Sequence, residues 1–152
     1  MSSVTDIHLD STSRLRIAIG RLSRRLRQTD AATAAGLTPT RTSVLLNVVR
    51  SGPIRLSELA DSEGLNPTML SRVVGELVDA RLLVRSSDAG DRRAAWVKAS
   101  ASGRRLVERM RRERTDALNR ALQSLSDDER RDLETALPAL ESLAEELKGS
   151  SS

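Results

Sequence analysis

The sequence contains no cysteine, phenylalanine or tyrosine, and it has one tryptophan and one histidine, His8. Without cysteine there can be no disulfide, no thiolate nucleophile, no cysteine-type zinc site and no thiol redox sensor. A single histidine near the amino end supplies neither a catalytic dyad nor a metal cluster. We therefore expect no metal and no cofactor, and a core built from Leu, Val, Ile and Ala.

Long apolar runs are also missing: no segment reaches the length of a membrane-spanning helix, and there is no signal peptide. The sequence lacks a phosphate-binding loop, paired carboxylates in an apolar setting, and a nucleophile beside a base. We therefore expect a cytoplasmic protein that is not an enzyme and has no membrane partner. At 152 residues it is one ordinary domain, or a small domain with extra helices for pairing.

The net charge of +4 is unevenly distributed along the chain. Residues 81–114 carry eleven Lys and Arg against four acids, whereas residues 115–152 carry four basic residues against nine acidic ones. A concentrated positive field is what a phosphate-binding surface requires. Arginine accounts for 23 of the 25 basic residues; this excess indicates little by itself, because a GC-rich genome favours arginine codons.

Helical patterns flank the middle of the chain. Residues 1–12 are polar and without pattern, which predicts a frayed tail. Thr38 followed by Pro39 predicts the start of a helix, and Ser126 with Glu129 forms a capping box that opens the last helix. Pro138 falls inside that last helix and predicts a kink or local break. Two leucine-rich stripes predict helices that pair: Leu15, Ile19, Leu22 and Leu26 in the first, and Leu133, Leu137, Leu140, Ala144 and Leu147 in the last.

Two short helices are predicted near the centre. The first covers 56–60 and is stopped by Gly64; the second is capped by Asn66 and has Pro67 as its first residue. One side of the second helix is apolar, and the opposite side carries hydroxyls, one arginine and a glycine: Thr68, Ser71, Arg72 and Gly75. Such a side leaves room for close approach to DNA, although an ordinary exposed helix face is the alternative.

A hairpin with an arginine-rich tip follows these helices. Residues 82–85 and 94–99 are predicted strands, and the turn between them contains Asp91-Arg92-Arg93. Two short helices and such a hairpin describe a winged helix-turn-helix, in which one helix enters the major groove and the hairpin reaches the neighbouring backbone or minor groove. One of Arg92 and Arg93 is expected to contact DNA, while the other, or Arg85, pairs with Asp91 or Asp88.

Several segments, in this order, resemble the MarR family of bacterial transcription regulators. They are Leu56-Ser57-Glu58-Leu59-Ala60, Asn66-Pro67-Thr68-Met69-Leu70-Ser71-Arg72-Val73-Val74, Leu82-Leu83-Val84-Arg85, Asp91-Arg92-Arg93 and Ser100-Ala101-Ser102-Gly103. The resemblance implies a mainly α fold with a small β-hairpin wing, in which N- and C-terminal dimerisation helices flank the winged helix-turn-helix. Its implied parts are a tail and dimerisation helix at 1–35, a DNA-binding lobe at 36–99, and dimerisation helices and a tail at 100–152.

The resemblance also implies a function. Members of this family form homodimers on pseudo-palindromic operators, and many are repressors that small aromatic acids or phenolic compounds release from DNA. The branch of the family that senses oxidants through cysteine does not apply to this chain. No motif marks an effector pocket, so its residues stay unknown. The alternatives are a low-specificity architectural DNA-binding protein without an effector, and a module for protein–protein contact with a vestigial DNA face.

The candidate DNA-binding residues come from the helices and the hairpin. Arg72 is expected to read a guanine or to clamp a phosphate, and Arg55 and Ser57 are expected near a phosphate. The full set is Arg55, Ser57, Asn66, Pro67, Thr68, Ser71, Arg72, Arg85, Asp91, Arg92 and Arg93.

Overall fold

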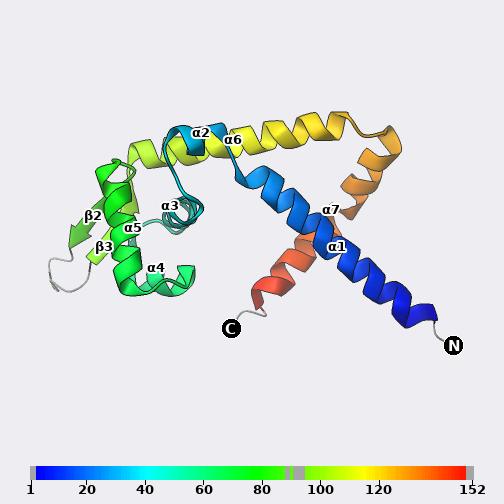
Figure 1. Ribbon diagram of the computed structural model, residues 1–152, viewed down its shortest axis with the longest axis horizontal. Helices are drawn as coiled ribbons and strands as arrows, with labels where there is room; N and C mark the ends of the chain where they lie inside the picture. The colour runs from blue at the N-terminus through cyan, green and yellow to red at the C-terminus, as the bar shows by residue number, and fades with distance from the viewer. Residues whose placement is uncertain (1–2, 88–89, 91–94, 150–152) are drawn as a thin grey trace. The chain divides into compact units, whose positions relative to one another are not determined.

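The computed structural model of the chain describes residues 3–87, 90 and 95–149 (Figure 1). The chain divides into two compact units, Met1–Arg114 and Thr115–Ser152. The helices are α1 (Ser3–Arg27), α2 (Asp30–Ala34), α3 (Pro39–Ser51), α4 (Leu56–Glu63), α5 (Pro67–Asp79), α6 (Ala101–Gln123) and α7 (Asp127–Gly149). The strands are β1 (Ile54–Arg55), β2 (Leu83–Ser87) and β3 (Ala95–Ala99).

A three-stranded antiparallel sheet lies beside the short helices. Its strand order is β1-β3-β2, so β3 pairs with both of the others. Leu83 of β2 faces Ala99 of β3, and Arg55 of β1 faces Trp96. The two predicted strands are confirmed within one or two residues, whereas β1 was not predicted. β1 is only two residues long, too short to show an alternating pattern in the sequence, and it forms a strand only through its pairing with β3.

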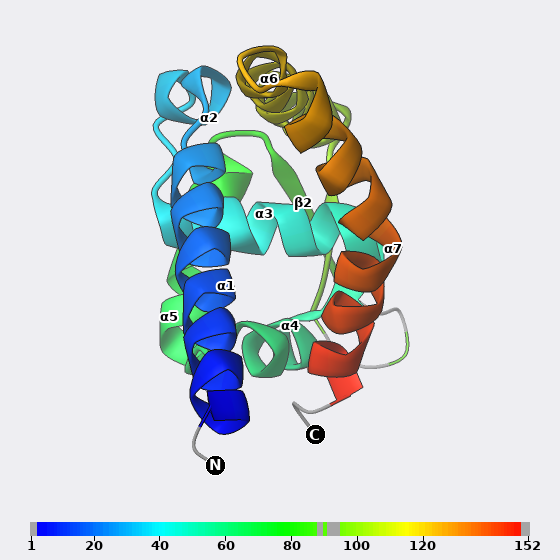
Figure 2. The same cartoon turned by 90° about the vertical axis from the view of Figure 1, so that its right-hand side faces the viewer.

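The core is aliphatic and lies where α3, α4 and α5 pack together against the sheet and the start of α6 (Figures 1 and 2). The predicted buried side of α5 is confirmed, since Leu70, Val73, Val74 and Leu77 are all at most 4% exposed. The larger of the other buried core side chains are Val44, Leu45 and Val48 of α3, Leu59 of α4, Leu83 and Val97 of the sheet, and Leu106, Val107 and Met110 of α6. Packing against this core holds α5 in a fixed position.

The first helix is longer than the sequence pattern predicts. α1 begins at Ser3, so residues 3–12 are helical and the frayed tail expected for them is wrong. A polar segment can extend a helix that an apolar stripe has already nucleated, because each added residue gains a hydrogen bond without a new nucleation cost.

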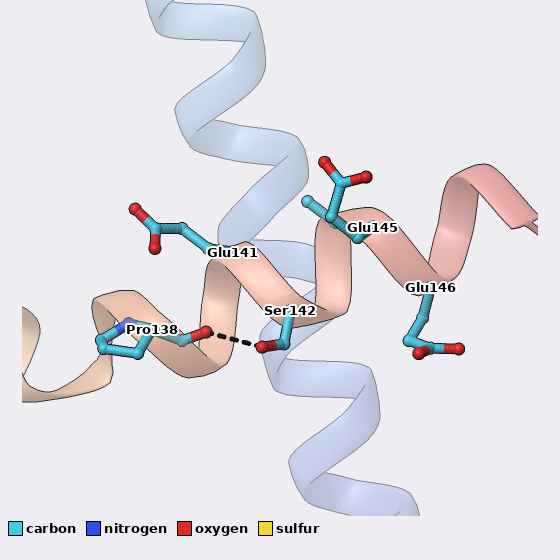
Figure 3. A pocket seen from close by; sticks show the side chains of 6 residues that line it. Pro138, Glu141, Ser142, Glu145 and Glu146 are labelled. Atoms are coloured by element: carbon cyan, nitrogen blue, oxygen red, sulfur yellow. Dashed lines mark hydrogen bonds between the residues drawn. The ribbon is translucent and has the colours of Figure 1, made fainter.

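The proline in α7 does not interrupt the helix. Pro138 lies inside the helix Asp127–Gly149, and the ribbon continues through it (Figure 3). A proline removes one backbone donor, and here it leaves the carbonyl of Glu134, an exposed residue, to be solvated. One turn later the hydroxyl of Ser142 donates to the carbonyl oxygen of Pro138 at 3.0 Å. The sequence predicted a kink or a local break at Pro138; the local break is absent, because α7 is one continuous helix.

Two neighbouring residues of α6 hold the corner between α1 and α2. The Glu113 carboxylate accepts hydrogen bonds from the backbone N–H of Ala31 at 3.1 and 3.2 Å. The Nε of Arg114 donates to the carbonyl oxygen of Leu26 at 3.0 Å. An anion thus caps the start of α2 and a cation caps the end of α1, the signs that helix termini favour.

Candidate nucleic-acid interface

Helices α4 and α5 are joined by a tight turn with the predicted capping chemistry. Gly64 ends α4 in the left-handed conformation, with φ of 63°, which glycine adopts without steric cost. The side-chain Oδ1 of Asn66 accepts a hydrogen bond from the backbone N–H of Met69 at 2.8 Å, and Pro67 is the first residue of α5. The amino end of α5 is therefore fixed by local contacts.

The side of α5 opposite the core is open to solvent. Thr68, Ser71 and Arg72 are all exposed, as predicted from their spacing. Met69 is also exposed, at 42% of its surface. Gly75 lies one turn further on, and a Cβ atom added to it would meet nothing within 4 Å. This exposed side combines small hydroxyls, one guanidinium and open space, which suits a helix that enters a DNA groove.

Arg85 of β2 contacts this side of α5. One of its terminal nitrogens (Nη2) donates to the hydroxyl of Ser71 at 3.0 Å. Two predicted site residues from different elements are therefore brought together. The contact ties the hairpin to the exposed side of α5.

Arg55 lies over the ring of Trp96. Its guanidinium carbon is 5.2 Å from the ring centroid, within the range of a cation–π contact. β1 and β3 pair at these two residues. Ser57, two residues later, is exposed in the first turn of α4.

The tip of the hairpin carries the other predicted contacts. Asp91, Arg92 and Arg93 lie outside the described residues, as does Asp88. Their predicted contacts with DNA and with one another stay predictions.

Sequence reasoning missed an ion pair beside the exposed side of α5. The Nε of Arg41, on α3, lies 2.8 Å from Oε2 of Glu76, and both side chains are about two-thirds buried. The hydrogen bond from Arg41 holds the pKa of Glu76 below its usual value; desolvation partly opposes it, and the charges of Arg41 and Arg72 make smaller lowering contributions. The spacing of four residues from Arg72 could have placed Glu76 on this side, but Arg41 is brought to it only by tertiary packing.

A cavity of about 930 Å³ lies beside the α1–α2 corner. Its lining combines arginines, a few apolar residues of α2, α3 and the segment between them, and the small polar side chains of Gln28, Thr29, Thr33, Thr42 and Ser43. The arginines are Arg24, Arg25, Arg27 and Arg114, and the apolar residues are Ala32, Leu37, Pro39 and Leu46. Such a lining suits a ligand with an anionic group on an apolar body.

Among the described residues, no three Asp, Glu or His side chains gather where they could hold a metal ion. No helix in that part of the chain is long and apolar enough to span a membrane.

The fold and the exposed side of α5 define a winged helix-turn-helix DNA-binding protein. Residues 37–95 match the model of the MarR family, and the chain is 31% identical to a candidate transcriptional regulator from Pseudomonas aeruginosa PA01, with a TM-score of 0.75 over 94% of this chain and 99% of that one. The chain belongs to the MarR family. It is therefore a DNA-binding transcription regulator and not an enzyme, as the sequence predicted.

Other solved structures share the fold at lower identity. The transcriptional regulator Tm0710 from Thermotoga maritima is 20% identical, with a TM-score of 0.78 over 93% of this chain and 98% of that one. A MepR mutant from S. aureus bound to an oligodeoxyribonucleotide is 18% identical, with a TM-score of 0.67 over 88% and 97%. No curated protein matches the chain.

Proposed function

We propose that this chain is a sequence-specific repressor that binds a pseudo-palindromic operator as a homodimer and leaves it when a small anionic ligand binds. One observation carries the proposal: α5 exposes Thr68, Ser71 and Arg72 while its other side is anchored in the core. A helix that binds DNA only through charge needs lysines and arginines on that side. Hydroxyls and a single arginine suit base edges, where arginine pairs bidentately with guanine.

The long helices support the dimer. Leu15, Ile17, Ile19 and Leu22 of α1 are 40–55% exposed, and Leu133, Leu137, Leu140 and Leu147 of α7 are 36–60% exposed. Apolar stripes of this length are normally covered. A second copy covers both, and it supplies the second α5 that a two-fold operator needs, about one helical turn (~34 Å) away.

The arginine-rimmed cavity supports the ligand response. Its volume of about 930 Å³ suits a small organic molecule. An acid in the cavity would meet Arg24, Arg25, Arg27 and Arg114, while its apolar body would lie against Ala32, Leu37 and Leu46. Arg114 lines the cavity and also donates a hydrogen bond to the end of α1. A ligand in the cavity would therefore change the contacts that hold the α1–α2 corner. Tyr and Phe are absent from the chain, so the cavity offers the ligand arginine, aliphatic and small polar side chains.

The test is a binding titration with DNA from around the protein's own gene, at several salt concentrations and with random DNA as competitor. We expect tight, competitor-resistant binding with a steep salt dependence, and release by aliphatic or aromatic carboxylic acids. If random DNA instead displaces the protein as effectively as the DNA from around its own gene does, the architectural alternative is supported. Such a regulator would act where the chromosome is, in the cytoplasm.

A further inference from the structure

Glu76 is an acidic residue on a surface expected to approach DNA. It lies on α5 one turn after Arg72 and next to Gly75. A carboxylate near the phosphate backbone lowers the affinity of a protein for every DNA sequence, because it repels the charge that all sequences share. A side chain that weakens binding in this way calls for a compensating role.

Glu76 is held in place from outside its own helix. Arg41, near the start of α3, donates through Nε to Oε2 of Glu76 at 2.8 Å. A terminal nitrogen of Arg41 (Nη1) also donates to the carbonyl oxygen of Gly36 at 3.2 Å. Arg41 is thus fixed at both ends of its guanidinium, and it fixes the carboxylate in turn.

Arg72 is the residue on which Glu76 can act. Residues four apart on a helix lie on the same side and are close enough for their charges to attract. The pKa of Glu76 is lowered first by its hydrogen bond from Arg41 and then by the charges of Arg41 and Arg72. Arg72 is exposed and has a long flexible side chain that could reach either a base edge or a phosphate.

We infer that Glu76, clamped by Arg41, is a positioning residue that sets the sequence specificity of Arg72. The carboxylate draws the guanidinium of Arg72 back along α5 and away from the phosphates. Arg72 then gives up this attraction only for a partner of matching geometry, such as the O6 and N7 atoms of a guanine. This inference rests on the proposed sequence-specific function, and it adds that discrimination between sequences comes partly from a carboxylate that never pairs with DNA.

The experiment compares two variants that each remove one negative charge from α5. Glu76→Gln removes the carboxylate that is clamped, and Asp79→Asn removes an exposed carboxylate at the end of the same helix. Two probes are used: a duplex enriched by the unaltered protein from a random library, and an unselected duplex of the same length. Affinities for both are measured over a range of salt concentrations.

We expect Glu76→Gln to raise the affinity for the unselected duplex and to lower the ratio between the two duplexes by roughly tenfold, in line with one specific arginine–guanine contact. Asp79→Asn should raise both affinities slightly and leave the ratio unchanged. If the unaltered protein discriminates clearly between the duplexes and Glu76→Gln leaves the ratio of the two affinities unchanged, this inference is wrong and the proposed function stands. No discrimination by the unaltered protein would overturn the proposed sequence reading and this inference together.

A second variant separates positioning from simple folding. Arg41→Gln removes the clamp but keeps the carboxylate, so it should also lower the ratio between the duplexes. In a protein that already carries Glu76→Gln, Arg41→Gln should have no further effect on that ratio. If the two changes lower the ratio independently, and in step with a loss of thermal stability, the pair is structural and the inference is wrong.

Discussion

A Cβ atom on Gly103 would lie 2.1 Å from the carbonyl oxygen of Leu82. The first turn of α6 therefore passes directly over the backbone that follows α5. The hydroxyl of Ser100 joins the same contact, since it accepts from the N–H of Gly103 at 2.9 Å and lies 2.7 Å from the carbonyl oxygen of Arg81, to which it can donate. This packing gives a physical reason for the serine and the glycine in the Ser-Ala-Ser-Gly segment.

Gly103→Ala should destabilise the protein. In an open helix this change would stabilise by roughly 1 kcal/mol, but here a methyl group cannot fit without moving the backbone of Leu82 or α6. We expect the free energy of unfolding to fall by about 1–3 kcal/mol, the usual range for overpacking. Urea denaturation measures it, and a gain in stability would show that the junction is looser than described.

Gly75→Ala should have the opposite effect on stability and should weaken DNA binding. Nothing lies within 4 Å of the added Cβ, so the helix should gain about 0.5–1 kcal/mol. The methyl group would stand on the exposed side of α5 and hinder close approach of DNA. Denaturation and DNA titration on the same sample check both parts; a more stable variant with unchanged affinity would show that DNA does not approach Gly75.

The bond between Arg85 and Ser71 should couple the hairpin to α5 when DNA binds. Ser71→Ala and Arg85→Gln should each weaken binding, and their effects should not add, because each removes the same hydrogen bond. We expect a coupling energy of about 0.5–1.5 kcal/mol, the usual net value of one hydrogen bond. A double-mutant cycle on DNA affinity measures it, and additive effects would mean that the two side chains meet DNA separately.

The start of α7 should lose stability in acid. Hydrogen bonds from the backbone N–H and then the hydroxyl of Ser126 hold the pKa of Glu129 below its usual value. A lowered folded-state pKa means that the contribution is complete above the ordinary glutamate pKa of about 4.3 and is lost as the pH falls through the folded-state value. The difference in unfolding free energy between the unaltered protein and Glu129→Ala should therefore shrink as the pH is lowered. Ser126→Ala removes one of the two donors to Glu129, so it should also reduce this difference in unfolding free energy. A difference that stays constant with pH would contradict the capping role.

Local chemistry explains what could be predicted from the sequence. Thr38, Asn66 and Ser126 accept hydrogen bonds from the first turns of their helices, at the positions their sequence patterns indicate. The end of α5 carries no such signal: Arg81 adopts a left-handed conformation, with φ of 61°, where a glycine would normally mark the stop.

Tertiary contacts explain what was missed. β1 needs the edge of β3, and α2 is only five residues long and begins against Glu113, a residue far along the chain. The pairing of Arg41 with Glu76 likewise spans 35 positions. No periodicity in the sequence encodes contacts of this kind.

The fluorescence of Trp96 can be used to follow DNA binding. In a chain without tyrosine or phenylalanine, all of the intrinsic fluorescence comes from this one indole, and the guanidinium of Arg55 lies 5.2 Å from its ring centroid. If Arg55 turns to a phosphate when DNA binds, the indole loses a neighbouring cation and its emission changes without any added label. Binding that leaves the emission unaltered would place the phosphates elsewhere. The fluorescence of Trp96 can thus report when DNA reaches the paired residues of β1 and β3, with a time resolution set by mixing.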